Sequence, residues 1–365
     1  MSARVTRKRA RTESEETPKQ ESEETNTTTC ADPQAPAADL GDEHENLERD
    51  AEFWISDGTV ILVANDVEFR FYRALLADHS PAFKAMFAGQ HPSRLVPIDE
   101  QQSITCPVVQ LTDSPQDLRH ILRAYLSGTE SGFLEAAEPS FDEISAYIRL
   151  GHKYELETLY EHSLEFLKHH YSDDFKTWTQ AKYWGPEYWS VNAAVGVVNL
   201  ARLLNEPSLL PTALLTCVYM KEDIMQGFER EDGTRETLTL DDIGRCFRAS
   251  GAIRQATVAG VVRTLRDKVS STCGTQASCL AALRRVLQGL DKVTWLLTSC
   301  PIRLAPDNLL DHKEKLGACT ACTAMVRRRN RKERAALWAR LPDLLDVEVS
   351  GWPSGEDGAP QDEAS

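Results

Sequence analysis

The part of this sequence that most restricts its possible folds is a strand–turn–strand pattern at residues 59–72. Residues 59–64 (TVILVA) form a short apolar run rich in β-branched side chains, and the polar pair Asn65 and Asp66 follows it. Asn tolerates a positive φ, so this pair can form a tight turn. Beyond the turn, apolar and polar residues alternate: Val67, Phe69 and Phe71 with Glu68, Arg70 and Tyr72. The pattern predicts a β-hairpin with a buried first strand.

Helices with recognisable ends follow the hairpin. The pairs Ser80–Pro81 and Ser114–Pro115 each offer an N-cap hydroxyl and a proline at the first helical position. Ser140 and Glu143 have the spacing of a capping box. Between the first two helices, residues 107–111 (PVVQL) have the composition of another short strand. We therefore expect residues 51–172 to form one α+β unit, a small sheet covered by helices.

The rest of the chain shows helical periodicity without a strand pattern of comparable quality. Helices are predicted at 195–204, 209–220, 241–270, 278–298 and 323–341. We expect residues 173–347 to be an all-helical C-terminal region. Residues 1–50 are rich in Glu, Thr, Ser and Pro, and residues 348–365 are acidic and Gly-rich. Such segments bury too little apolar surface to offset their ordering entropy, so both are predicted to be disordered tails.

Two stretches of the α+β unit resemble a known family. The stretch SDGTVILVANDVEFRFYRALLADHSPAFKAMF resembles the opening of a BTB/POZ domain, where an aspartate precedes a hairpin and an S-x-x-F-x-x-M-F helix follows. The stretch CPVVQLTDSPQDLRHILRAYLSG is similar to the next strand and helix of that family. The matching positions are Asp57, Leu75, Leu76, Ser80, Phe83, Met86 and Phe87. The resemblance implies a BTB/POZ fold over residues 51–172.

One position departs from the family pattern, and later stretches extend the likeness. The family usually has a histidine where this chain has Tyr72, so the buried pair that this position forms with Asp57 is expected to be altered. A phenol can still donate a hydrogen bond. The stretches YIRLGHKYELETLYEHSLEFL, VVNLARLLNEPSLLPTALL and ALWARLPDLLDV are similar to stretches in BTB proteins of mushroom-forming (basidiomycete) fungi. That likeness covers most of residues 51–347.

The resemblance implies recognition rather than chemistry. BTB domains commonly form homodimers, some recruit a cullin-type ubiquitin-ligase scaffold, and others act in transcriptional repression. The expected function is a non-enzymatic protein–protein interaction adaptor, with a substrate adaptor of a cullin-type ubiquitin ligase as one form. The alternative is a nuclear transcriptional regulator that assembles complexes through BTB self-association. In the family the segment before the hairpin often mediates dimerisation. Here that segment, residues 45–53, is short and highly charged, which disfavours a dimer formed by exchange of this segment.

Charge and motif content narrow the function classes further. The net charge of −15 disfavours direct contact with nucleic acid, and no run approaches the ~20 apolar residues of a membrane span. The N-terminus has no apolar secretory segment. Nine cysteines, an odd number scattered over a long chain without a secretory signal, indicate reduced thiols rather than disulfides. We expect the protein in the nucleus, the cytoplasm or both. No G-x-S-x-G, H-E-x-x-H, P-loop or G-x-G-x-x-G motif supports an enzyme.

A C-x-x-C pair is the one pattern that suggests a cofactor. Cys319 and Cys322 have the spacing of two ligands to one zinc ion. Cys300 and Cys279 are the candidates to complete the set, with Cys273 and His312 also near in sequence. A second C-x-x-C pair is missing, so free cysteines and no cofactor are the simpler interpretation, and a structural zinc site is the alternative. A redox pair lacks the βαβ setting that such pairs use.

Three further clusters have two interpretations each. Arg7, Lys8, Arg9 and Arg11 could serve nuclear import or form a basic patch without a role. The run Arg327, Arg328, Arg329, Arg331, Lys332 and Arg334 could bind nucleic acid, but a solvated helix face is favoured in an acidic chain. Trp178, Tyr183, Trp184, Tyr188 and Trp189 could bind a ligand, although packing between the two folded units is the favoured role.

Overall fold

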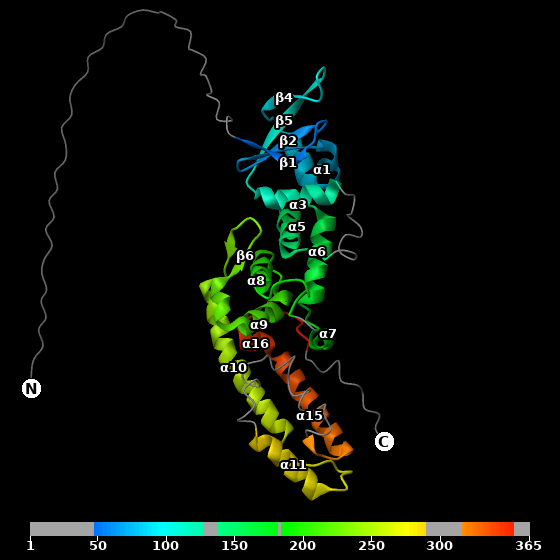
Figure 1. Cartoon of the computed structure of the whole chain (residues 1–365), viewed down its shortest axis with the longest axis vertical. Coiled ribbons are helices and arrows are strands. Elements are labelled where there is room, and N and C mark those ends of the chain that lie inside the picture. Colours follow the sequence, from blue (N-terminus) through cyan, green and yellow to red (C-terminus); the bar gives the residue numbers. More distant parts are fainter. Residues whose placement is uncertain (1–46, 127–137, 182–183, 290–315, 354–365) are drawn as a thin grey trace, which may run out of the picture. The chain divides into compact units, whose positions relative to one another are not determined.

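The computed structural model describes residues 47–126, 138–181, 184–289 and 316–353. Five strands form one mixed sheet in the order β1-β3-β2-β5-β4 (Figure 1). Their bounds are β1 Glu48–Trp54, β2 Val60–Ala64, β3 Val67–Phe71, β4 Ser93–Pro97 and β5 Ser103–Leu111. β2 and β3 pair antiparallel through a turn at Asn65, whose φ is 50°. The predicted hairpin is therefore confirmed.

The two faces of the sheet bury different side chains, as the strand period of two requires. One face carries Val60, Leu62, Phe69 and Phe71, which pack into the main core of the domain with its helices. The opposite face carries Ile61 and Val63 of β2, which pack with Val96 of β4 and Cys106 of β5. Because both faces of β2 are buried, its sequence is apolar throughout rather than alternating.

The polar residues of β3 are also buried, at 3% exposure for Glu68 and 1% for Arg70. Arg70 donates from Nε to the Gly58 carbonyl at 3.0 Å and from Nη1 to the Pro97 carbonyl at 2.8 Å. Glu68 pairs with Arg94 of β4 at 2.5 Å. The alternation of β3 thus separates an apolar face from a buried, hydrogen-bonded face, because the β4–β5 hairpin covers that second side.

The described residues of this part of the chain also form helices α1 Arg73–His79, α2 Pro81–Phe87, α3 Pro115–Leu126, α5 Phe141–Tyr154 and α6 Glu157–His170. The Ser80 hydroxyl accepts the N–H of Phe83 at the start of α2. Ser140 and Glu143 form both bonds of the capping box at the start of α5. The helix starts predicted from Ser-Pro and S-x-x-E spacing are confirmed.

The C-terminal region is helical, as expected from its periodicity. Its described helices are α7 Phe175–Gln180, α8 Ala193–Leu203, α9 Leu210–Met220, α10 Leu240–Thr264, α11 Gln276–Gln288, α15 Thr320–Ala339 and α16 Leu341–Leu345, with 3-10 turns η1 Pro207–Leu209 and η2 Lys221–Gln226. One small hairpin, β6 Phe228–Glu229 and β7 Arg235–Glu236, is an addition to this region. Its turn contains Gly233 at φ 79°, a conformation that favours glycine.

The C-terminal helices share their largest core with the two helices that end the α+β unit. This core joins Phe141, Ile144 and Ile148 of α5 and Leu167 of α6 to buried residues of α7, α8, α9, α10, α15 and α16. Trp178 and Trp338 are its largest side chains and are at most 1% exposed. Further along, α10 and α15 run side by side and meet α11 around a smaller core (Figure 1) of Val261, Leu265, Leu283, Leu316 and Val326.

Ordered structure reaches into the segments expected to be disordered tails at both ends. β1 begins at Glu48, inside the segment expected to be disordered, because Asp50 accepts the backbone N–H groups of Glu52 and Phe53 and pairs with Arg119 of α3. At the other end, Trp352 donates from Nε1 to the Trp338 carbonyl at 3.0 Å and packs on its ring. Residues 1–46 and 354–365 lie outside the described residues.

Candidate functional site

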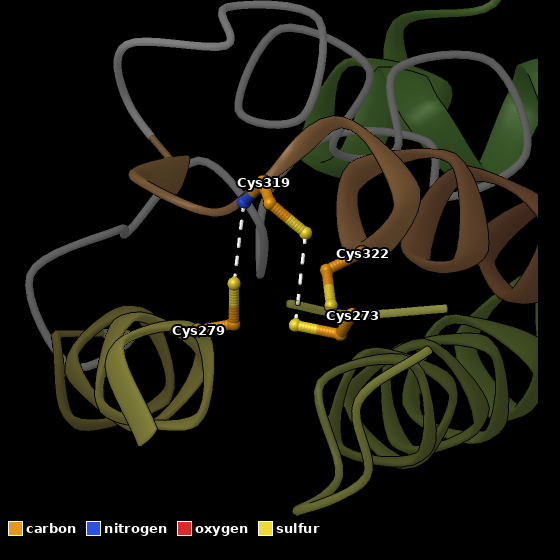
Figure 2. Close-up of side chains that lie close together, drawn as sticks. All are labelled: Cys273, Cys279, Cys319 and Cys322. Carbon is orange, nitrogen blue, oxygen red and sulfur yellow. Dashed lines mark hydrogen bonds between the residues drawn. The ribbon is translucent and has the colours of Figure 1, made fainter. Parts of the chain in front are cut away.

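Four cysteine side chains come together at the junction of α10, α11 and α15. The Sγ atoms of Cys273, Cys279, Cys319 and Cys322 all lie within 4.8 Å of one another. Figure 2 shows the sulfur atoms of the three segments directed toward a common space. The Sγ atoms of Cys319 and Cys273 are 3.7 Å apart, which is contact between separate thiols. Four sulfur donors in this arrangement can hold one tetrahedral metal ion.

The helix ends determine where these side chains lie. Cys319 is the N-cap residue of α15 and Cys322 is in its first turn, so the C-x-x-C spacing directs both thiols to one side. Cys279 lies in the first turn of α11. Cys273 lies in the connection between α10 and α11, where its backbone N–H donates to the Ser270 carbonyl at 3.1 Å. The site therefore joins the start of α15 to two segments that are distant in sequence: Cys279 is 40 residues and Cys273 is 46 residues before Cys319.

Backbone N–H groups point at two of the sulfur atoms. The N–H of Cys319 donates to Cys279 Sγ at 3.2 Å, and the N–H of Ser270 donates to Cys322 Sγ at 3.4 Å. The Cys319 donor, helped by the Thr275 hydroxyl, lowers the pKa of the Cys279 thiol to about 7. Burial raises the pKa of the Cys322 thiol to about 12. Donors of this kind stabilise sulfur in its anionic form.

The other described cysteines are in apolar cores. Cys106 of β5 is buried on the face of the sheet that carries Ile61 and Val63, and it donates to the Gly58 carbonyl at 3.4 Å. Cys217 and Cys246 are in the shared helical core, where burial raises the pKa of both thiols, that of Cys246 to about 12. Such thiols stay protonated and are poor ligands and nucleophiles at neutral pH.

The four-cysteine cluster differs from the candidate set expected from sequence. Cys319, Cys322 and Cys279 of the candidate zinc set lie together, and Cys273 is the fourth member of the cluster. Cys300, the expected fourth ligand, and His312 lie outside the described residues. Cys273 lacks a motif spacing to its partners, since five residues separate it from Cys279. The signal that could have found it was its position just before the start of α11.

A second polar cluster joins the β6–β7 hairpin to helices α3 and α5. Arg230 donates to Asp117 Oδ1 at 2.7 Å, to Asp142 Oδ1 at 2.9 Å and to Glu236 Oε1 at 3.2 Å. Arg149 of α5 also pairs with Glu236 at 2.7 Å. The Arg230 side chain is only 7% exposed and its three carboxylate partners are 10–12% exposed, whereas the Arg149 side chain is 32% exposed. The network therefore joins one buried cation and three buried carboxylates to a second cation at its edge.

Burial and ion pairing shift the pKa values of the groups in this network in opposite directions. Burial raises the pKa of the Asp117 and Asp142 carboxyls above the usual range, and the nearby charge of Arg230 partly reverses that shift. Burial by itself lowers the pKa of Arg230, but the carboxylates of Asp117, Asp142 and Glu236 raise it overall. Sequence patterns did not indicate this cluster, because its members are far apart in sequence: Arg230 and Asp117 are separated by 113 positions.

The residues that carry the family resemblance are mostly structural. Leu76, Ser80 and Phe83 are fully buried, Phe87 is 4% exposed, and Leu75 and Met86 are partly buried against the same core. Tyr72 donates from its hydroxyl to Asp57 Oδ1 at 2.9 Å, which raises the pKa of the phenol. This pair was expected to be buried, but it lies at the surface, because Asp57 is in the exposed turn before β2.

The basic run of α15 divides between exposed and packed positions. Arg327, Arg328, Arg331 and Lys332 are exposed, whereas Arg329 and Arg334 are partly buried. Between them, Glu333 pairs with Arg263 of α10 at 2.8 Å. The N-terminal cluster Arg7, Lys8, Arg9 and Arg11 lies outside the described residues.

The aromatic cluster packs at the join between the α+β unit and the C-terminal helices. Trp178 contacts Trp184 and Trp338, and Trp189 contacts Phe141 of α5. Trp189 also donates to the Pro139 carbonyl at 2.8 Å. Tyr188 is 40% exposed, and Tyr183 lies outside the described residues. The packing role expected from sequence fits these contacts.

Comparison with known families assigns the first part of the chain. The family model described as BTB/POZ domain matches residues 55–171. This range corresponds to the sheet from the hairpin onward and to helices α1 to α6. A comparison with curated proteins finds no match for the chain. Among the described helices, none is both long and apolar enough to cross a membrane.

Proposed function

Because residues 55–171 form a BTB/POZ domain, a module that mediates self-association and binding to other proteins, we propose that this chain is a non-enzymatic interaction adaptor. In this proposal the BTB/POZ domain binds one partner, and the C-terminal helices bind or position a second one. The observation that carries the proposal is the family match together with the core that the two parts share.

The contacts between the two parts support a coupled role. Phe141 and Ile144 of the domain lie in the same core as residues of α8, α9 and α10. In addition, Arg230 of the hairpin is bonded to Asp117 and Asp142 of the domain. Buried contacts of both kinds disfavour independent motion of the parts. A partner held by the helices would therefore keep a defined distance from a partner held by the domain.

The finer form of the proposal is a substrate adaptor of a cullin-type ubiquitin ligase. A direct pull-down with purified full-length chain and a purified cullin-type scaffold tests it. Phe83→Ala removes a fully buried ring and serves as the control for a damaged fold, and Arg235→Ala changes an exposed ion pair and serves as the neutral control. Stable binding by wild type and Arg235→Ala supports the ligase adaptor. Absence of binding by well-folded wild type overturns it.

Self-association is the second interaction that we propose for the domain. β4 is an edge strand of the sheet, and its Leu95 is 68% exposed. Edge strands with exposed apolar residues are open to pairing with another chain. β1, the other edge, is less available, because Glu52 pairs with Arg123 of α3 at 2.5 Å in the same chain.

Light scattering during size-exclusion chromatography tests self-association. We expect the mass of a dimer for wild type and a shift toward monomer for Leu95→Lys. Leu240→Lys is the matched control, because Leu240 is 86% exposed but belongs to α10. A monomeric wild type at all concentrations would contradict this interaction, and so would an unchanged dimer in Leu95→Lys.

The alternative function is a nuclear regulator that assembles transcription complexes through BTB self-association. The exposed basic residues Arg327, Arg328, Arg331 and Lys332 of α15 favour it. Arg7, Lys8, Arg9 and Arg11 would serve as the import signal. Comparing the localisation of the intact chain with that of a chain lacking residues 1–12 tests this import signal. Loss of the nuclear signal in the shortened chain supports the regulator, and an unchanged cytoplasmic signal opposes it.

A further inference from the structure

We infer that Cys273, Cys279, Cys319 and Cys322 bind one zinc ion, which holds the α10–α11–α15 junction together. The geometry carries this inference. A zinc ion with four sulfur ligands at ~2.3 Å places neighbouring sulfur atoms about 3.8 Å apart. The Cys319–Cys273 separation is 3.7 Å, and all four Sγ atoms lie within 4.8 Å of one another. Because the 4.8 Å limit exceeds the ideal separation by about 1 Å, shifts of that size or less would complete the tetrahedron.

The donor chemistry selects the metal. Four thiolates and no oxygen or imidazole donor form a set that prefers zinc over magnesium or calcium. Binding converts four thiols to thiolates and releases four protons to solvent, and no electron is transferred. The ion and its ligands then carry a net charge of 2−, the sum of +2 and four times −1. The surroundings must therefore stabilise negative charge.

The surroundings supply that stabilisation. The N–H groups of Cys319 and Ser270 already donate to two of the sulfur atoms. The two thiols of α15 lie at its N-terminus, and this helix is 20 residues long, so its dipole favours an anion there. The guanidinium of Arg329, two turns further along α15, interacts electrostatically with Cys322. Its Nη1 is buried and has no hydrogen-bond partner among the described residues.

Among the residues that the structure describes, the apolar packing of the junction forms two small clusters. The main cluster has Val261, Leu265, Leu283, Leu316 and Val326 as buried members. The neighbouring cluster consists of three of the cysteines, packed with Val269, Ala318 and Cys319. A bound metal ion contributes directly to the stability of the segments that supply its ligands. The four thiols lie where such an ion would connect the three segments.

The coordination set assigns a structural rather than a catalytic role to the ion. Four protein ligands fill a tetrahedral site and leave no position for water or substrate. The ion would connect α11 to the start of α15, and thereby position the exposed basic face of that helix. This inference concerns residues outside the 55–171 match, so it stands independently of the adaptor function.

Metal analysis of purified full-length chain is the first test. We expect about one zinc ion per chain in wild type and a loss of most of it in Cys279→Ser and Cys319→Ser. Cys106→Ser is the matched control: this thiol is as buried as that of Cys279, donates to a carbonyl as a serine would, and belongs to β5 rather than to the junction. It is expected to keep the full zinc content.

A second test uses wild type alone, so that it does not depend on variants that fold. Zinc is exchanged for Co²⁺, whose visible absorption reports tetrahedral sulfur coordination. Hydrogen exchange is then compared with and without a chelator. We expect faster exchange after chelation in residues 265–289 and 316–326 and unchanged exchange in the sheet at residues 60–71.

Several outcomes would overturn the inference. Wild type without stoichiometric metal that also fails to take up Co²⁺ with a tetrahedral sulfur spectrum excludes the site. Full zinc content in Cys279→Ser and Cys319→Ser locates the ion elsewhere. Iron in place of zinc in the purified chain rejects the assignment of the metal. Chelation that leaves exchange at the junction unchanged rejects the structural role.

Discussion

Arg230 is nearly as buried as the apolar residues around it, yet it remains charged because carboxylates surround it. A guanidinium presents its donors in a planar fork, and here different nitrogen atoms reach Asp117, Asp142 and Glu236. The same contacts neutralise two carboxylates that belong to the BTB/POZ domain. A single side chain of the C-terminal region thus satisfies charges buried in the first part of the chain.

Replacing Arg230 by leucine is expected to be strongly destabilising. The variant Arg230→Leu leaves Asp117 and Asp142 buried without their cation, and breaking a buried pair in this way costs about 3–5 kcal/mol. Urea unfolding followed by circular dichroism measures the change in the free energy of unfolding. Arg235→Ala is the matched control in the same hairpin: its partner Glu229 is exposed, so we expect less than about 1 kcal/mol. Equal effects of the two variants would refute the proposed importance of the network.

His170 makes a second prediction at the scale of one residue. Burial and the neighbouring His169 lower its pKa from 6.5 to about 4, so the ring is neutral in the folded chain at neutral pH. Between pH 6.5 and about 4 the unfolded chain binds more protons at this site than the folded chain. The free energy of unfolding therefore falls as the pH falls through this window.

The variant His170→Gln removes this titration. Between about pH 7 and pH 5 we expect wild type to lose about 1 kcal/mol more stability than the variant, a value reduced for partial exposure of the ring. Thermal unfolding of both proteins across this range measures the difference. His162→Gln, an exposed position on the same helix, is the control and is expected to behave like wild type. Parallel pH profiles for wild type and His170→Gln would disprove the shift.

At the scale of the element, the caps were the most reliable local signals. Ser80 and Ser140 begin helices as the sequence predicted, because an N-cap bond forms between residues only three positions apart. β4 was not predicted, since Leu95 and Val96 are its only large apolar residues and its pairing with β5 is what makes it a strand. β5 likewise begins four residues earlier than its apolar run.

Ser80 is the cap with the greatest expected effect. Its hydroxyl accepts the Phe83 N–H at 2.8 Å and donates to the Tyr154 carbonyl at 2.5 Å, so it ties α2 to the end of α5. Ser80→Ala is expected to cost about 2–3 kcal/mol, because it removes a cap and leaves a buried carbonyl unsatisfied. Ser140→Ala, a more exposed cap, is expected to cost about 1 kcal/mol. Chemical denaturation of both variants checks the order, and the reverse order would contradict it.

At the scale of the whole molecule, the join between the domain and the C-terminal helices depends on one close approach. Gly196 of α8 faces the ring of Phe141 of α5, and a Cβ atom there would lie 2.1 Å from Phe141 Cζ. The ring has little room to move, because Trp189 and Phe228 pack against it. The helices can meet at this distance only because residue 196 has no side chain.

Gly196→Ala is therefore expected to destabilise the chain by about 1–3 kcal/mol through overpacking, although alanine favours a helix. Gly251→Ala is the matched control in α10: nothing lies within 4 Å of its Cβ position, so we expect a gain of about 0.5–1 kcal/mol. Thermal unfolding of both variants measures the two signs. Stabilisation by Gly196→Ala would show that the parts do not pack as described.

The sequence by itself determined the local elements and their order. The hairpin at residues 60–71, the caps at Ser80 and Ser140 and the helical character beyond residue 173 all depend on neighbours within a few positions. The C-x-x-C pair belongs to the same class, because one helical turn places Cys319 and Cys322 together. The family resemblance added the topology that joins these elements.

The tertiary structure alone decided which distant residues meet. Cys273 joins the thiol cluster across 46 residues from Cys319, and Arg230 reaches Asp117 across 113. It also decided that Glu68 of the hairpin is buried while Asp57, in the turn just before it, is exposed, although both are charged residues. Periodicity reports which face of an element a residue occupies, but not what covers that face. Contacts of this kind arise only when separate elements pack, so no local pattern encodes them.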